Sequence, residues 1–334
     1  MGQVTVLGAG FMGSGLTIPA SDNGHAVALW GTHLDAHIIA ELRAGRPHPK
    51  LGVQLPDRVT PFESTHLPAA LRGADVVILA VTSDGALPTL NLARGLLGPT
   101  TPLVVVSKGL VQWEDRVVTL SAAIAAVGYP RTITVGGPSK ALELARRVPT
   151  RVLYASADAE ARGLARRWLQ TSYYRVDETD DQLGLELCSA LKNAYAIAIG
   201  LCDGLVAAGR ADAMYNTKAA LFAQAIVEMA RLGARLGLRP ETFHGLGGSG
   251  DLFVTGVAGR NRTFGELRGS GMPTGDVVAR LQARDELTEG YAAIRWCWRY
   301  AAEQEIHDLP LLCALHRIVY EDQDVERELL DACF

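Results

Sequence analysis

Three glycines near the N-terminus have the spacing expected of a turn that binds a dinucleotide. Gly8, Gly10 and Gly13 follow the apolar segment 3–7 and precede a helix-like sequence. In such a turn the first glycine permits a sharp change of direction, the second lets the backbone approach a pyrophosphate, and the third lets the following helix pack against the strand. A glycine-rich turn without a ligand is the alternative. The strand–turn–helix context favours a dinucleotide site.

The segment after the next apolar strand bears on the choice of cofactor. NAD sites usually carry an acidic residue there that binds the ribose, whereas NADP sites carry a nearby arginine. This chain has Gly31, Thr32 and His33 after the predicted strand 26–30, and Asp35 comes into range only if that strand ends later. Thr32 is a candidate cofactor contact, and the choice between NAD and NADP stays open.

Two lysines stand in positions where they could act on a bound substrate. Lys192 lies in an apolar, small-residue segment, and burial there would suit it to general acid–base chemistry. The alternative for Lys192 is a structural one, in which its ammonium reaches the helix surface. Lys108 follows the apolar strand 103–107, at the end where parallel sheets bind ligands, and could address a phosphate or a carbonyl oxygen. The alternative for Lys108 is that it is an exposed loop lysine that binds no ligand.

A glycine-rich segment supplies further polar side chains. Asp251 lies within Gly-Ser-Gly-Asp-Leu, and Gly259 precedes the pair Arg260 and Asn261. Arginine binds phosphate oxygens bidentately, and asparagine with backbone N–H groups can complete the shell around an anion. The segment predicts a cradle for an anionic, hydroxylated ligand, with a mobile surface loop as the alternative. Because neither an HExxH nor a GxSxG motif is present, we expect no metal and no serine nucleophile.

The elements that must hold these residues change in type along the chain. Continuous apolar strands separated by helix-length segments, such as 85–98 and 112–127, indicate a parallel sheet covered on both faces. We therefore expect a Rossmann-type, doubly wound α/β domain over 1–180. Leucines at helical spacing begin near 183 and predict an all-helical domain over 181–334, interrupted by a segment at 245–271 that is too rich in glycine for regular helix. The predicted strands are 4–7, 26–30, 75–81, 103–107, 132–137 and 151–156.

Composition narrows the class of protein. The 334 residues are 48% hydrophobic and 20% charged, and 32 basic against 36 acidic residues give a net charge of −4. This balance predicts neither nucleic-acid binding nor stable membrane association, and it suits an enzyme acting on small molecules. The five cysteines form no CxxC pair and the start of the chain does not look like a signal peptide, so we expect reduced thiols and a cytoplasmic location.

Several short motifs in the same order show a resemblance to a known family. They span the chain from the glycine turn to its C-terminal third, and the chain resembles the NAD(P)-dependent glycerol-3-phosphate dehydrogenases nearly end to end. The motifs are the residues 8–13, 107–110, 137–139, 191–193, 216–220, 250–252, 260–261 and 289–291.

The resemblance implies a reaction, a cofactor and an assembly. Members of the family reduce dihydroxyacetone phosphate reversibly to sn-glycerol 3-phosphate with NAD(P)H, supply glycerophospholipid synthesis, and commonly form homodimers. By resemblance Lys192 is the proton donor and acceptor, and Lys108 and Asp251 complete the catalytic set. The implied substrate contacts are Lys108, Gly137, Ser139, Lys192, Asp251, Arg260 and Asn261. The implied cofactor contacts are Gly8, Gly10, Phe11, Met12, Gly13, Thr32, Lys108, Ala141, Arg260, Leu287 and Glu289.

The chain departs from the family pattern at several positions near the expected site. Lys140 stands where the family usually has phenylalanine, Thr82 where it has proline, and Gly259 where it has serine. The stretch 206–215 is longer than in many bacterial members. The sequence leaves open how these changes affect substrate binding.

Two other functions compete with this one. A related two-domain dehydrogenase could act on a 2-keto or 2-hydroxy acid, since Arg260 would bind a carboxylate as well as a phosphate, and the preferred substrate would distinguish the two. A non-catalytic dinucleotide sensor is the second alternative. It is disfavoured because Lys108, Lys192 and Asp251 all stand in their motifs.

Overall fold

The computed structural model describes residues 1–284, 286 and 288–333, which form two compact units. Unit 1 comprises residues 1–108 and 120–182, and unit 2 comprises residues 109–119 with the described part of 183–334. The sequence-based boundary at 180/181 places residues 109–119 in the first domain, whereas in the structure they group with the second. The chain therefore passes from one unit to the other three times.

Unit 1 is built on an eight-stranded sheet with the order β10-β9-β8-β5-β4-β1-β2-β3. The strands are β1 (Gln3–Leu7), β2 (Ala26–Trp30), β3 (Val59–Phe62), β4 (Ala74–Leu79), β5 (Leu103–Val105), β8 (Thr132–Gly136), β9 (Thr150–Ala155) and β10 (Tyr174–Thr179). The run from β3 to β8 is parallel and has the strand order of a Rossmann fold. The predicted fold class is confirmed.

The expectation of a wholly parallel sheet is wrong at one edge. Strand β9 pairs antiparallel to β8, and β10 then runs parallel to β9. Two strands of this eight-stranded sheet were not predicted: β3, an edge strand that contains Pro61, and β10, whose polar residues mask its pattern. Both lie at edges, where less of the strand is buried and the continuous apolar signal is weaker.

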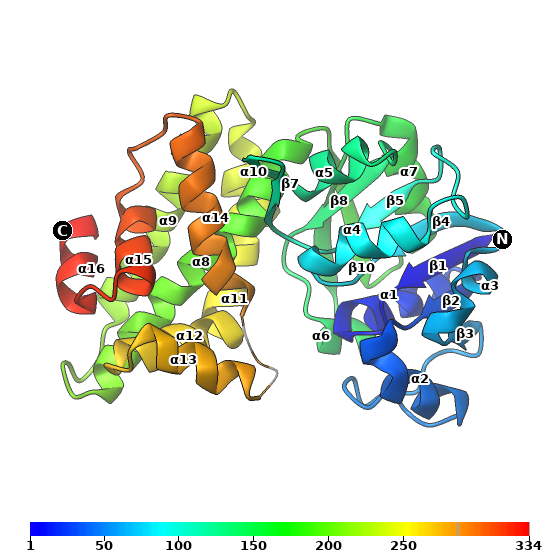
Figure 1. Ribbon diagram of the computed structural model, residues 1–334, viewed down its shortest axis with the longest axis horizontal. Coiled ribbons are helices and arrows are strands. Elements are labelled where there is room, and N and C mark those ends of the chain that lie inside the picture. Colours follow the sequence, from blue (N-terminus) through cyan, green and yellow to red (C-terminus); the bar gives the residue numbers. More distant parts are fainter. Residues whose placement is uncertain (285, 287, 334) are drawn as a thin grey trace. The chain divides into compact units, whose positions relative to one another are not determined.

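Helices cover both faces of this sheet, which explains why the central strands β1 and β4 are buried on both sides (Figure 1). Helix α1 packs against α6 and α7, while α4 packs against α5. The helices are α1 (Phe11–Asp22), α2 (Ala36–Arg43), α3 (Leu67–Leu71), α4 (Ser83–Leu92), α5 (Leu120–Ala126), α6 (Ala141–Ala145) and α7 (Ala159–Leu169).

The predicted helix over 112–127 is wrong in its first part. Residues Leu110–Trp113 and Arg116–Thr119 form the antiparallel hairpin β6–β7, and helix starts only at Leu120. The hairpin is attached to α14 (Glu289–Glu303) of unit 2, because the Glu303 carboxylate accepts from Val117 N at 2.9 Å and Arg299 donates to the Asp115 carbonyl at 2.8 Å. A hairpin needs such a partner for stability, and the partner is remote in sequence.

Unit 2 is otherwise helical, as predicted (Figure 1). Its elements are α8 (Gln182–Ala207), α9 (Tyr215–Arg235), α10 (Pro240–His244), a π-helical turn (Leu246–Gly250), α11 (Asp251–Val257), α12 (Arg260–Gly269), α13 (Thr274–Gln282), α14 (Glu289–Glu303), α15 (Pro310–Tyr320) and α16 (Val325–Cys333). Among the described residues α8 alone is long and apolar enough to cross a membrane, and 78% of its most apolar window is buried inside the structure, as in a core helix.

The glycine-rich segment is mostly helical, so the predicted interruption over 245–271 is wrong. Its glycines are needed for close packing. A Cβ on Gly265 or Gly269 of α12 would lie 2.2 Å from a backbone oxygen of α8. A Cβ on Gly200 of α8 would likewise lie 2.1 Å from the Arg262 oxygen. Because neither helix carries a side chain at the crossing, α12 lies directly against α8.

A buried glutamate fixes α8 to two other helices. The Glu228 carboxylate on α9 accepts a hydrogen bond from Tyr195 Oη on α8 at 2.8 Å. It also accepts from the N–H groups of Leu311 and Leu312 at the start of α15, at 2.6 and 3.0 Å. Burial raises the pKa of Glu228, and these hydrogen bonds oppose that rise. Glu228 thus satisfies the otherwise unpaired N-terminus of α15.

Replacing Glu228 by glutamine is expected to lower the free energy of unfolding by about 1–3 kcal/mol, because one amide oxygen cannot accept from all of these buried donors. Denaturant titration of the wild type and variant measures the loss. The matched control is Glu326→Gln, an exposed position on α16, which is expected to change stability by less than about 0.5 kcal/mol. Equal stabilities for Glu228→Gln and the wild type would contradict the assigned role.

Candidate active site

The glycine turn of unit 1 has the shape that a dinucleotide requires. Gly8 has a φ of +112°, and a Cβ there would lie 2.7 Å from the Ala80 carbonyl oxygen. A Cβ on Gly13 would lie 2.0 Å from the Gly8 oxygen, so the strand and helix are too close for a side chain. A Cβ on Gly10 would meet no described atom within 4 Å. The turn therefore leaves open the space beside Gly10 through which a pyrophosphate would approach.

Helix α1 begins beside this open space. Gly10 is its N-cap, and none of the described side chains caps it, so the first N–H groups of the helix can bind an anion. Phe11 is 45% exposed and Met12 packs partly against the core. Ala141, the first residue of α6, lies next to α1, where a Cβ on Gly15 would be 3.5 Å from its carbonyl oxygen. These predicted cofactor contacts therefore gather around one end of α1.

The end of β2 carries a compact polar turn. The strand ends at Trp30, and a short 3-10 turn then brings Asp35 back toward the glycine turn. Asp35 Oδ2 accepts from Thr32 N and Thr32 Oγ1, both at 2.9 Å, and from Ala9 N at 3.3 Å. Asp35 therefore contacts the dinucleotide turn although β2 ends at Trp30, so a later end of this strand is not needed. This carboxylate oxygen is engaged by the protein itself.

Three further predicted residues follow the carboxyl ends of the neighbouring strands β5 and β8. The Lys108 carbonyl accepts from Ser83 Oγ at 2.8 Å. Gly137, directly after β8, has a φ of +93°. Ser139 Oγ is buried and has no hydrogen-bond partner among the described residues. Because an unpaired buried hydroxyl is unfavourable, its position favours a polar ligand at this edge of the sheet.

The predicted acid–base residues of unit 2 come together in the structure. Lys192, on α8, is only 6% exposed, so the alternative of an ammonium at the surface is wrong. Its Nζ donates to Asp251 Oδ1 at 2.6 Å and to Thr255 Oγ1 at 3.0 Å. Thr255 in turn donates to the Asp251 carbonyl at 2.7 Å. Helix α11 therefore presents an acid and a hydroxyl, one turn apart, to the same ammonium.

A second polar chain begins at the next residue of α8. Asn193 Nδ2 donates to Glu289 Oε2 at 3.1 Å, and Asn193 Oδ1 accepts from Asn261 Nδ2 at 2.9 Å. Asn261 Oδ1 accepts from Gly290 N at 3.0 Å. The predicted substrate residue Asn261 and the predicted cofactor residue Glu289 are therefore connected through Asn193, which holds both in place.

Arg260 is the exposed first residue of α12, and no partner for its guanidinium is found in the described part of the chain. Gly259 before it has a φ of +142°, which accounts for glycine at this position. Arg262 Nε donates to Asp203 Oδ2 at 2.7 Å, and Lys218 pairs with the other oxygen. Burial raises the pKa of Asp203, but the hydrogen bonds from Arg262 and Lys218 outweigh it and lower that pKa. An ionised Asp203 thus anchors the turn that carries Arg260.

The predicted site residues divide between the two units. Unit 1 holds the glycine turn, Thr32, Lys108, Gly137, Ser139 and Ala141, whereas unit 2 holds Lys192, Asp251, Arg260, Asn261 and Glu289. Leu287 lies outside the described residues. Thr255 and Asn193 are not among the site residues predicted from the sequence. Their spacing was the available signal, because Thr255 is one helical turn after Asp251 and Asn193 adjoins Lys192.

The two sets of residues suit complementary steps. Unit 1 offers an anion-binding turn with space for a dinucleotide, and unit 2 offers a buried ammonium held by a carboxylate. A lysine in this setting can protonate an oxygen that gains negative charge, and an exposed arginine such as Arg260 can bind an anionic substituent. Taken separately, these two sets provide the residue types needed to reduce a carbonyl group in an anionic molecule.

Comparison with known proteins points to one family. The model of the NAD-dependent glycerol-3-phosphate dehydrogenase N-terminus matches residues 3–162, and that of the C-terminus matches residues 181–329. The chain is 37% identical to an NADP(+)-dependent glycerol-3-phosphate dehydrogenase of Archaeoglobus fulgidus, over 98% of each chain. It is 34% identical to a glycerol-3-phosphate dehydrogenase [NAD(P)+] of Geobacter metallireducens, over 98% of this chain and 96% of the relative. The crystal structure of glycerol-3-phosphate dehydrogenase from Coxiella burnetii superposes with a TM-score of 0.85 at 28% identity, covering 99% and 98% of the two chains.

Proposed function

Because the chain belongs to the NAD-dependent glycerol-3-phosphate dehydrogenase family, we propose that it reduces dihydroxyacetone phosphate reversibly to sn-glycerol 3-phosphate with NAD(P)H. The observation that carries the proposal is the buried contact of Lys192 with Asp251 and Thr255. It provides a proton donor in a unit that also carries Arg260, which is available for a phosphate group.

The site residues have distinct roles in this proposal. When bound, the reduced nicotinamide supplies the hydride that adds to the carbonyl carbon. Lys192 Nζ gives a proton to the carbonyl oxygen as negative charge develops there, and it takes the proton back in the oxidative direction. The proton that Lys192 loses is replaced from solvent. By resemblance to the family, Lys108 of unit 1 supplies a second positive charge that would stabilise the developing alkoxide.

Asp251 and Thr255 act through Lys192 and are positioning residues. The 2.6 Å contact from Asp251 keeps the ammonium in place, and the 3.0 Å contact from Thr255 restricts its direction. Because Asp251 is 2% exposed, water competes little for this contact. A fixed donor removes the cost of orienting the proton during the reaction.

Phosphate binding is assigned to residues that the structure leaves available. Arg260 of unit 2 supplies the charge. By resemblance to the family, Ser139 of unit 1, whose buried hydroxyl has no hydrogen-bond partner among the described residues, is a further candidate for binding the substrate. Binding energy from the phosphate, which does not react, would orient the carbonyl carbon for hydride transfer. An unphosphorylated ketone should therefore react poorly.

Replacing Asp203 by asparagine is expected to raise KM for the phosphorylated substrate by about three- to tenfold and to change kcat less, because Arg262 loses a charged partner and the first turn of α12, which carries Arg260, is held less firmly. Steady-state kinetics separates the two constants. The matched control is Glu328→Gln, which removes a comparable ion pair to Arg317 elsewhere in unit 2. Equal KM values for the two variants would refute a positioning role for Asp203.

The proposed reaction is tested with purified protein by the loss of absorbance of NADH and, separately, NADPH on adding dihydroxyacetone phosphate. Unphosphorylated dihydroxyacetone and a 2-keto acid are the comparison substrates. Loss of absorbance with dihydroxyacetone phosphate alone would support the proposal. Comparing kcat/KM with NADH and with NADPH would give the cofactor preference. Activity confined to the 2-keto acid would favour the carboxylate dehydrogenase. Cofactor binding without turnover of any ketone would favour the sensor.

The family resemblance also supports three statements about the cellular role. We propose that the product serves glycerophospholipid synthesis, that the protein acts in the cytoplasm, and that it is a homodimer. Light scattering on the purified protein measures its mass, and a monomer at working concentration would exclude the homodimer.

A further inference from the structure

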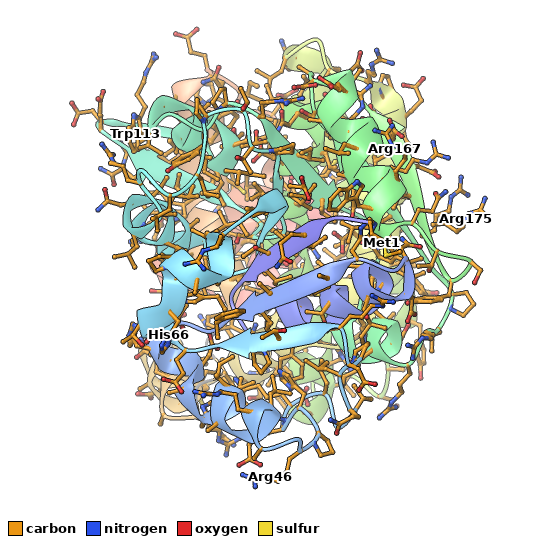
Figure 2. All side chains as sticks on the ribbon, turned by 90° about the vertical axis from the view of Figure 1, so that its right-hand side faces the viewer. Met1, Arg46, His66, Trp113, Arg167 and Arg175 are labelled. Carbon is orange, nitrogen blue, oxygen red and sulfur yellow. The ribbon has the colours of Figure 1, made fainter. Side chains whose placement is uncertain are left out.

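The loop between α2 and β3 contains a buried histidine that contacts the dinucleotide turn. It begins at the surface, where the exposed Arg46 is labelled in Figure 2. Two residues later His48 is fully buried, and its Nε2 lies 3.0 Å from the Ala9 carbonyl oxygen. Ala9 stands between the first two glycines of the turn. None of the sequence motifs pointed to this contact, which joins residues 39 positions apart.

The hydrogen bonds around the ring define its state. His48 Nδ1 accepts from two backbone N–H groups, those of Lys50 and Leu51, each at 3.1 Å. A nitrogen that accepts carries no proton, so the proton of the neutral ring is on Nε2 and is donated to Ala9. Burial lowers the pKa of His48, in keeping with a neutral ring.

Both polar groups of Ala9 are therefore held by side chains. Its carbonyl accepts from His48 and from Ser14 Oγ, the latter at 3.1 Å, and its N–H donates to Asp35. Because a trans peptide is planar, fixing the Ala9 carbonyl also fixes the opposite direction of the Gly10 N–H. No acceptor for that N–H is found among the described residues, and Gly10 borders open space.

We propose that His48 is a positioning residue for dinucleotide binding, which holds the Ala9–Gly10 peptide so that the Gly10 N–H points toward the pyrophosphate. The inference rests on the proposed dinucleotide site and adds a residue outside the glycine motif to it. His48 acts through Ala9 and touches no cofactor atom itself. Without it, the turn must be ordered when the cofactor binds, which weakens binding.

Two isosteric variants separate the donor function of His48 from its role in the loop. Asparagine places an acceptor near the position of Nδ1 and lacks the donor to Ala9, whereas glutamine places a donor near Nε2 and lacks the acceptor. Titration calorimetry of the full chain with NADPH and with NADH gives Kd, and thermal unfolding without cofactor gives Tm. We expect His48→Asn to raise both Kd values about fivefold, as for loss of one hydrogen bond. We expect His48→Gln to lower Tm while keeping both Kd values near those of the wild type.

The control is His25→Asn, at another buried histidine of unit 1, which stacks on Trp168 with ring centroids 4.2 Å apart. It is expected to leave both Kd values unchanged whatever its effect on Tm. Unchanged Kd values in His48→Asn, or an equal rise in both His48 variants, would overturn the inference. If His48→Asn does not fold, Ser14→Ala removes the other donor to the same carbonyl, and unchanged Kd values there would overturn it. Failure of the wild type to bind either cofactor would instead refute the dinucleotide site.

Discussion

Replacing Lys192 by alanine is expected to lower kcat for dihydroxyacetone phosphate by about a thousandfold or more, while Kd for NADPH or NADH changes less than about twofold. The variant loses the proton donor, and with it the positive charge beside the developing alkoxide. The glycine turn lies in the other unit and keeps its backbone geometry. Steady-state kinetics and cofactor titration on the same preparation measure both quantities.

The arginine variant separates charge from proton transfer at this position. Lys192→Arg keeps a positive charge beside Asp251 but does not release its proton near neutral pH. We therefore expect kcat to stay low in Lys192→Arg even if substrate binding is partly kept. If either variant turned over at the wild-type rate, the proton would have to come from another group.

Replacing Arg260 by alanine is expected to lower kcat/KM for dihydroxyacetone phosphate by about ten- to a hundredfold, as for the loss of a hydrogen bond to a charged group. Activity with unphosphorylated dihydroxyacetone should change little, because that substrate lacks the anion. For Arg260→Lys we expect a kcat/KM for dihydroxyacetone phosphate between those of the wild type and Arg260→Ala, since lysine keeps the charge but not the bidentate geometry. Kinetics with both substrates measures the difference.

An exposed arginine elsewhere in unit 2 serves as the control for Arg260. Arg295 on α14 lies over the rings of Trp296 and Tyr320. Arg295→Ala is expected to leave kcat/KM for the phosphate ester unchanged. If Arg260→Ala also left it unchanged, the phosphate would have to be bound by other residues.

Features carried by neighbouring residues could be predicted from the sequence. The glycine turn at Gly8, Gly10 and Gly13, the core strands of the sheet and the long helix around Lys192 depend on spacing within a few residues. Backbone sterics and the burial of one face determine such elements locally. For the same reason the fold class could be predicted before any contact was known.

Other features depended on which remote segments meet. The hairpin β6–β7 is stabilised by residues of α14 that lie more than 180 positions later in the chain. The glycines of α12 favour flexible backbone when taken alone, yet they are helical because α8 leaves no space for a side chain. Local propensity was overridden in both places by packing.

The sequence by itself determined the two domain types, the dinucleotide turn and the residue types available for proton transfer and anion binding. The tertiary structure decided how these residues are held. It buried Lys192 against Asp251, 59 positions away, and it placed His48 against Ala9. The physical reason is that burial and hydrogen bonding depend on which segments lie side by side, and residue spacing specifies this only within one helix, strand or turn.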